Sequence, residues 1–263
     1  IFAFMENEVK VEIKLGFDKL RSSVLSRCST SYARERAEQE RISICKEEVV
    51  GRLALVDEFR QILSFESSFP DSPFVDCIPF LIPLQSEFTY IDLTSLSLLR
   101  DALDLLRRLL SFFANCKDGK YPALKAMSLN ILSFPEVLRR IDVILDKYGN
   151  VRDNASPTLY DIRRSIREKE GAASRRIEAI LKKAQQDGVA DEDATVSVRD
   201  GKLLIPVSSG NKRKVPGVVY DESSSGKTSF VEPIEVLEIN NQVRELRFEE
   251  QREIIKILTE FTD

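Results

Sequence analysis

An apolar seam at helical spacing limits what this chain can fold into. The seam follows Ser156 and Pro157, a capping serine and the proline that suits the first position of a helix. A helix of about thirty residues rises about 1.5 Å per residue and reaches about 45 Å, so it projects from a small domain unless another element packs along it. The sequence therefore predicts a long helix with a partner. The apolar members of the seam are Leu159, Ile162, Ile166, Ala173, Ile177, Ile180 and Ala184.

A second seam, from Ile234 to Phe261, supplies a candidate partner for this helix. The segment between the two seams has the composition of strands, and it contains Asp200–Gly201, a pair favoured in two-residue hairpin turns. We therefore expect an antiparallel helix pair with a small β-sheet at its tip. The four expected strands are Thr195–Val198, Leu203–Ile205, Val215–Tyr220 and Thr228–Val231.

The first 150 residues are expected to form a helical domain. The leucine-rich stretch Leu98–Phe113 covers more than one face of a helix that Thr94 or Ser95 can cap, so this helix should be the buried centre of the domain. Four prolines interrupt Phe69–Asp92, which we expect to be extended chain or broken strand. Lys117–Lys120 makes a turn. The expected helices are Phe17–Cys28, Ser31–Glu40 (helix or turn), Val49–Ser64, Ser95–Cys116, Tyr121–Leu132 and Phe134–Lys147.

These expectations describe a mainly α fold with a small β insertion. A length of 263 residues allows about two domains with a sizeable core, and 43% hydrophobic and 31% charged residues are typical of a soluble helical protein. We expect four segments: a helical core domain at 1–150, an outgoing helix at 151–192, a β-rich insertion at 193–233 and a returning helix at 234–263.

Composition excludes several kinds of chemistry. The sequence has no histidine, which removes His-dependent nucleophilic catalysis and every zinc site that needs imidazole. The paired carboxylates at Glu249–Glu250 and Asp191–Asp193 fall on a charged helix face and in a linker, so acid/base or metal chemistry there is disfavoured. The four cysteines form no C-x-x-C pair and are expected to be reduced thiols of a cytosolic protein. They are Cys28, Cys45, Cys77 and Cys116.

No segment of the sequence is expected to enter a membrane. The apolar segment Ile1–Phe4 is too short for a signal-peptide core and lacks a basic leader. Charged residues interrupt even the apolar stretch Leu96–Ala114. The net charge of −4 argues against wholesale coating of nucleic acid, so any such contact must come from a local patch.

The segment Ser225–Thr228 imitates a phosphate-binding P-loop. A true P-loop needs a glycine five residues before its Gly-Lys-Thr and a helix that starts at the Lys-Thr. Here Asp221 occupies the glycine position, and the residues from Thr228 to Pro233 have the composition of a short strand. The default reading is a Ser/Gly-rich loop that joins two strands.

The β-rich insertion carries a local excess of positive charge. Over residues 195–233, six basic residues stand against four acidic ones (Asp200, Asp221, Glu222 and Glu232), which leaves an excess of two positive charges in a chain that is negative overall. Lys212–Lys214 falls in a loop that we expect to be flexible, where long cationic side chains reach phosphates without reading bases. An ordinary solvated turn is the alternative reading. The candidate nucleic-acid-binding residues are Arg199, Lys202, Lys212, Arg213, Lys214 and Lys227.

Three motifs of this region resemble a known family. Asp200–Val207, Val215–Pro233 and Glu238–Leu246 are similar to the clamp and returning-lever motifs of MutS-II, the bacterial MutS subfamily without the mismatch-reading front domains. The segment Ser156–Leu181 is similar to the outgoing lever helix of that subfamily. Two positions depart from its pattern, because Ser208 stands where lysine is common and Tyr220 where histidine is common.

The resemblance implies a larger protein. Its parent would be a cytoplasmic homodimer whose next domain is an ABC-type ATPase that binds ATP and magnesium, often followed by a small Smr nuclease domain. Such proteins are implicated in binding branched DNA, in restraining recombination and in acting on stalled ribosomes and their RNA. We expect the chain to be a non-catalytic core, lever and clamp module that holds no cofactor or metal and engages nucleic acid but no membrane.

Two other hypotheses stay open. The helix pair could be a structural coiled-coil arm whose tip binds a protein. A free-standing nucleotide-binding enzyme would rest on Ser225–Thr228 alone.

Overall fold

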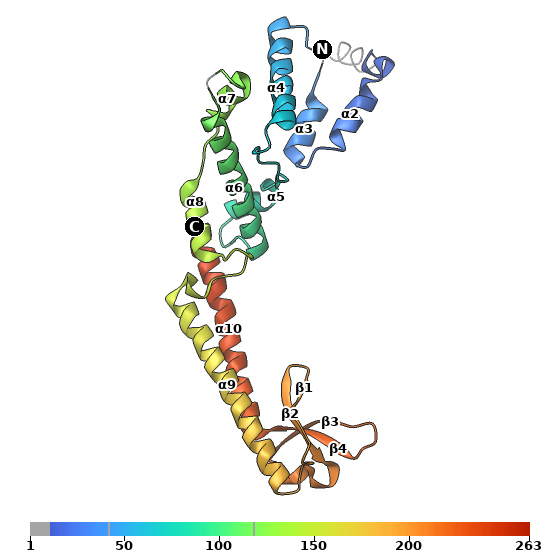
Figure 1. The fold of residues 1–263 in the computed structure, drawn as a ribbon, viewed down its shortest axis with the longest axis vertical. Helices are drawn as coiled ribbons and strands as arrows, with labels where there is room; N and C mark the ends of the chain where they lie inside the picture. The colour runs from blue at the N-terminus through green and yellow to red at the C-terminus, as the bar shows by residue number, and fades with distance from the viewer. Residues whose placement is uncertain (1–10, 42, 118) are drawn as a thin grey trace. The chain divides into compact units, whose positions relative to one another are not determined.

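The computed structural model describes residues 11–41, 43–117 and 119–263, which form a mainly helical fold with one small antiparallel sheet (Figure 1). The segment Ile1–Phe4 and the turn residue Asp118 lie outside the described residues. The chain divides into two compact units. One contains the residues up to Asn150 together with Phe261–Asp263, and the other is Val151–Glu260. In the described part of the chain, no helix is both long and apolar enough to cross a membrane.

The first unit is built from short and medium helices. Helix α2 packs on α3, α4 packs on α7, and α6 packs on both α7 and α8. One core cluster of the unit joins Ile62 of α4 and Phe113 of α6 to Tyr121 and Leu124. The carboxylate of Glu58 accepts hydrogen bonds from the first free N–H groups of α7 and so fixes α7 on α4. The helices are α2 (Phe17–Leu25), α3 (Ser31–Gln39), α4 (Lys46–Phe65), α5 (Ile78–Leu81), α6 (Leu93–Asn115), α7 (Pro122–Ser128) and α8 (Pro135–Ile144), with a 3-10 turn η1 (Ile82–Gln85).

Two local expectations for the first unit are wrong. Asp92 caps α6, because its carboxylate accepts the Ser95 N–H at 3.0 Å and the Ser95 hydroxyl at 2.6 Å. The segment expected to be extended has no regular structure at 70–77 but is helical at 78–85. Pro79 and Pro83 fall in the first turns of α5 and η1. Backbone N–H groups of a first turn have no hydrogen-bond partner within the helix, so proline, which lacks an N–H, is tolerated there.

Helix α6 is less buried than the sequence predicts. Its buried apolar residues are Leu96, Ala102, Leu105 and Phe113. Leu106, Leu109 and Leu110 of α6 line an open apolar hollow of about 460 Å³. The helix is therefore covered on part of its circumference only.

The second unit contains the predicted pair of long helices. Helix α9 (Pro157–Gln186) begins at Ser156, whose hydroxyl oxygen accepts the Leu159 N–H at 3.0 Å. Helix α10 (Ile234–Thr262) lies beside α9 in Figure 1. Three ion pairs show that the two helices are antiparallel, because the partners on α10 have falling residue numbers as the partners on α9 have rising ones. The pairs are Arg163–Glu250 at 2.7 Å, Glu170–Arg247 at 2.9 Å and Arg176–Glu235.

A four-stranded antiparallel sheet, in the order β1-β2-β4-β3, forms between the end of α9 and the start of α10. Asp200 and Gly201 have φ values of 48° and 76°, the left-handed geometry that a tight two-residue hairpin turn requires. The predicted strands are therefore confirmed, with small shifts in their ends. They are β1 (Ser197–Arg199), β2 (Lys202–Ser208), β3 (Gly217–Glu222) and β4 (Thr228–Pro233).

One face of the sheet packs on the two helices. Ile205 of β2 pairs with Val231 of β4, which pairs with Val219 of β3, so their side chains share a face. The core of this unit joins that face to the apolar seam of α9 and to α10. Its members include Ala173, Ile177, Leu181, Ala184, Ile205, Val207, Val231 and Val236. The part of the α9 seam from Ala173 to Ala184 therefore belongs to this core.

Candidate nucleic-acid interface

Three of the six candidate cations are held by carboxylates. Arg199 pairs with Asp221, and its guanidinium lies 3.6 Å from the centre of the Phe230 ring. The Lys212 Nζ lies 2.9 Å from a carboxylate oxygen of Glu222. Arg199 thus joins β1 to β3, and Lys212 joins the turn after β2 to β3, and in each pair a carboxylate offsets the positive charge. The local excess that the sequence predicts is therefore not spread evenly over the insertion.

Lys202 is the third paired cation, and its partner is buried. The Glu232 side chain is 2% exposed, and its carboxylate accepts hydrogen bonds from Lys202 Nζ at 2.8 Å and from Asn240 Nδ2 at 3.1 Å. A buried carboxylate without partners would be strongly destabilising. Lys202 and Asn240 therefore connect β2 and β4 to α10.

The other three candidates are exposed cations. Arg213 and Lys214 end a 3-10 turn, η3 (Ser209–Lys214), where a flexible loop was expected. Lys227 lies in the turn between β3 and β4, and its carbonyl accepts the Ser209 N–H at 2.9 Å, which ties that turn to the start of η3. In the described residues, none of the three side chains has an ion pair. They are the candidates that can still meet an external anion.

Lys183 is a candidate that the sequence analysis missed. It lies in the last turn of α9, and its side chain lines a hollow of about 410 Å³ together with Lys214. Arg176 and Glu235, which also line this hollow, pair with each other. Lys183 and Lys214 are exposed and have no ion pair in the described part of the chain, and Asp187 is the remaining charged side chain of the hollow. The adjacent lysines Lys182–Lys183 were the available signal, but Lys183 and Lys214 are 31 positions apart in the sequence.

The segment that imitates a P-loop is a hairpin turn. Strand β4 begins at Thr228, so the helix that a P-loop requires does not start there and the strand reading is confirmed. The turn uses its own N–H groups, because Ser223 N–H donates to Thr228 O and Gly226 N–H donates to Ser223 O, both at 2.8 Å. In residues 11–41, 43–117 and 119–263, no group of three or more histidine, cysteine, aspartate or glutamate residues could hold a metal ion.

Tyr220, which departs from the family pattern, supports the β1–β2 turn. Its hydroxyl donates to Asp200 at 2.5 Å, and its ring lies 5.0 Å from Lys202 Nζ. The hydrogen bond to the Asp200 carboxylate raises the pKa of Tyr220 above its ordinary value. Ser208, the other departure, donates its backbone N–H to the Val189 carbonyl and offers no cation.

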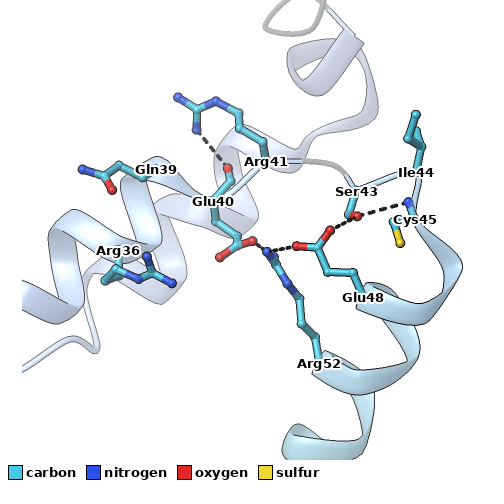
Figure 2. Close-up of a pocket in the computed structure, with 9 residues that line it drawn as sticks. All are labelled: Arg36, Gln39, Glu40, Arg41, Ser43, Ile44, Cys45, Glu48 and Arg52. Atoms are coloured by element: carbon cyan, nitrogen blue, oxygen red, sulfur yellow. Dashed lines mark hydrogen bonds and ion pairs between the residues drawn. The ribbon is translucent and has the colours of Figure 1, made fainter.

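A polar pocket in the first unit serves a structural purpose. Figure 2 shows Arg52 between the carboxylates of Glu40 and Glu48. The Ser43 hydroxyl donates to the Glu48 carboxylate at 2.5 Å. These interactions satisfy both carboxylates and connect the end of α3 to the start of α4. We therefore interpret the residues of this pocket as structural contacts that connect the two helices.

Comparison with known proteins identifies relatives over nearly the whole chain. It is 34% identical over 252 residues to the Endonuclease MutS2 of Thermomicrobium roseum, a match that covers 94% of this chain and 31% of that protein. It is 30% identical to the Endonuclease MutS2 of Alkaliphilus metalliredigens over 258 residues, which is 98% of this chain and 32% of the relative. It is also 30% identical to the Endonuclease MutS2 of Halalkalibacterium halodurans over 263 residues, which is 98% of this chain and 33% of the relative. No family model matches the chain.

The chain spans about a third of the length of the curated relatives that it matches. The matched region covers up to 98% of the chain. The chain is therefore a relative of the proteins named Endonuclease MutS2 and matches about one third of their length.

Proposed function

We propose that this chain is the core, lever and clamp part of a MutS2-like ATPase, and that its sheet end contacts nucleic-acid phosphates. The relatives carry the name Endonuclease MutS2, which indicates a DNA-related function. The observation that carries the proposal is a group of exposed cations near the sheet that have no ion pair among the described residues, in a chain with a net charge of −4. This group, the cationic tip, consists of Lys183, Arg213, Lys214 and Lys227.

The cationic tip suits contact with the backbone of a nucleic acid. Lysine and arginine side chains that are free of carboxylates neutralise phosphates and release counterions, which gives binding without base reading. Arg199, Lys202 and Lys212 suit this role less well, because each is already paired with a carboxylate, of Asp221, Glu232 and Glu222 respectively. The ligand would be branched DNA or ribosomal RNA.

The long helices provide a mechanical connection to the tip. Ion pairs join α9 to α10 at three levels, and the core of the second unit joins both helices to the sheet. Asn240 of α10 adds a direct hydrogen bond to Glu232 of β4. A shift of the two helices would therefore move the sheet with them. In the full-length protein, closure driven by ATP and magnesium in a separate ATPase domain would act through this pair, in a cytoplasmic homodimer.

The test uses the full-length protein with the substitutions Lys183→Ala, Arg213→Ala, Lys214→Ala and Lys227→Ala combined. Binding to branched DNA, to plain duplex and to ribosomes is measured side by side with and without ATP. The proposal expects weaker binding to at least one of these ligands. A matched control removes four exposed cations that are unpaired among the described residues, Lys14, Lys19, Lys46 and Arg252. Equal binding by the tip variant and the control contradicts the assignment.

A second candidate function is a protein-binding arm. Strand β3 lies at an edge of the sheet and exposes Val218 (53%) and Val219 (41%), and an exposed edge strand can pair with a strand of another protein. In that case a partner protein would be captured at moderate salt, and nucleic-acid binding by the tip variant would equal that of the control.

A further inference from the structure

We propose that a groove between the β1–β2 hairpin and α10 binds an unpaired nucleotide of a nucleic-acid strand. The groove has a volume of about 540 Å³, within the roughly 300–1,000 Å³ of ordinary small-ligand sites. This inference rests on the proposed function, and it adds a second contact that differs from the cationic tip. The residues on which it depends are Lys202, Glu232, Asn240, Arg244, Phe248 and Gln251.

Most charges around the groove cancel in pairs. Glu232 is neutralised by Lys202 at 2.8 Å. The Glu250 carboxylate forms an ion pair with Arg163 at 2.7 Å, and Arg247 forms one with Glu170 at 2.9 Å. The carboxylates of the groove therefore do not repel a phosphate as free charges would.

Arg244 is the cation that stays available in the groove. Its guanidinium donates to the Asn241 side chain at 3.1 Å, and it has no ion pair among the described residues. The side chain is exposed on α10. It can therefore form a charge-assisted hydrogen bond to a phosphate that enters the groove.

Phe248 lies one helical turn after Arg244. Residues four apart on a helix are neighbours on one face, with Cβ atoms about 5–6 Å apart. The Phe248 side chain is 59% exposed, although it lines the groove. An exposed aromatic ring beside an unpaired guanidinium matches a nucleotide, whose base stacks on the ring while its phosphate meets the cation.

Amide groups at the same groove can meet the edge of the base. Asn240 uses its Nδ2 group on Glu232, which leaves its side-chain oxygen as an acceptor. Gln251 is exposed and follows Phe248 on the groove side of α10. Bases inside a duplex present neither a free face nor a free Watson–Crick edge, so the groove fits an unpaired nucleotide and not a duplex.

The experiment compares the full-length protein with its variants Phe248→Ala and Arg244→Gln. The probes are a labelled oligothymidylate strand, a duplex of equal length and free thymidine monophosphate. Loss of one stacked base predicts roughly 5- to 150-fold weaker binding of the strand by Phe248→Ala, with duplex binding unchanged. Phe248→Tyr keeps the stacking face and should restore strand binding.

The controls have the same chemistry outside the groove. Tyr160→Ala removes an aromatic side chain that is 47% exposed on α9, and Arg252→Gln removes an exposed arginine of α10. The inference is overturned if the groove variants bind the strand as these controls do, if they lose duplex binding equally, or if free thymidine monophosphate competes as well as the strand. If the groove proposal is overturned but the protein still binds duplex in a salt-dependent way, the proposed function is unaffected. If the protein binds no nucleic acid, both the groove proposal and the proposed function are wrong.

Discussion

Replacing Lys202 by methionine tests whether this cation is structural. The substitution keeps an unbranched side chain but removes the charge that faces the Glu232 carboxylate at 2.8 Å. Leaving one member of a buried ion pair alone costs about 3–5 kcal/mol. Lys202 is 42% exposed and Asn240 still donates to Glu232, so water and the amide reduce the loss to about 1–3 kcal/mol.

The assay is urea unfolding of the protein, with hydrogen exchange at the amides of β2 and β4 to localise the effect. Lys227→Met is the matched control, because Lys227 is exposed and unpaired among the described residues, and its stability should change by no more than about 0.5 kcal/mol. The double variant Lys202→Met with Glu232→Leu removes the whole pair and should recover most of the loss. If Lys202→Met is as stable as Lys227→Met, the ion pair of Lys202 with Glu232 does not stabilise the fold.

Three further predictions concern stability. Gly217→Ala would place a Cβ 2.3 Å from the Glu232 carbonyl oxygen, so we expect a loss of about 1–3 kcal/mol in thermal unfolding, whereas Gly210→Ala meets no atom within 4 Å and should be near neutral. Ile177→Ala empties a core position that is 1% exposed and should cost about 2–5 kcal/mol, and an unchanged melting temperature would refute the packing of α9 on the sheet. Asp92→Ala should cost about 0.5–2 kcal/mol at neutral pH. Hydrogen bonds from Ser95 lower the pKa of Asp92, so the stability that Asp92 contributes is present above its unfolded-state pKa and is lost as the pH falls through its folded-state pKa. A stability difference between Asp92→Ala and the unchanged protein that persists in strong acid would contradict this.

Local sequence signals predicted the second unit well. Ser156–Pro157 defines the start of α9 because a capping hydroxyl and a proline act within one turn. Asp200–Gly201 defines the β1–β2 turn because both residues tolerate left-handed backbone geometry. Such features depend on neighbouring residues only, so a single sequence is enough to find them.

The state of the cations could not be predicted in this way. Arg199–Asp221 and Lys202–Glu232 join residues that are 22 and 30 positions apart, and their pairing depends on how the strands align. The sequence therefore placed six cations in one candidate site, and three of them have no carboxylate partner in the part of the chain that the structure describes. Lys183 joins Lys214 only because the end of α9 and η3 line the same hollow.

The cap of α6 shows the same limit on a smaller scale. Asp92, Thr94 and Ser95 are all suitable capping residues, and three-dimensional packing decides among them. The leucines of α6 predicted a buried helix, but the first unit covers only part of its surface. Periodicity reports which faces are apolar and does not report how much of each face is covered.

The most direct test of the central claim is the salt dependence of duplex DNA binding by the full-length protein. The variant Arg213→Ala, Lys214→Ala and Lys227→Ala removes three cations that have no ion pair within residues 11–41, 43–117 and 119–263. The control Lys14→Ala, Lys19→Ala and Lys46→Ala removes the same charge from the first unit. If the cationic tip contacts phosphates, the slope of log K against log salt should fall by up to about 2.7 in the tip variant and stay unchanged in the control. Equal slopes for the tip variant, the control and the unchanged protein would contradict the account.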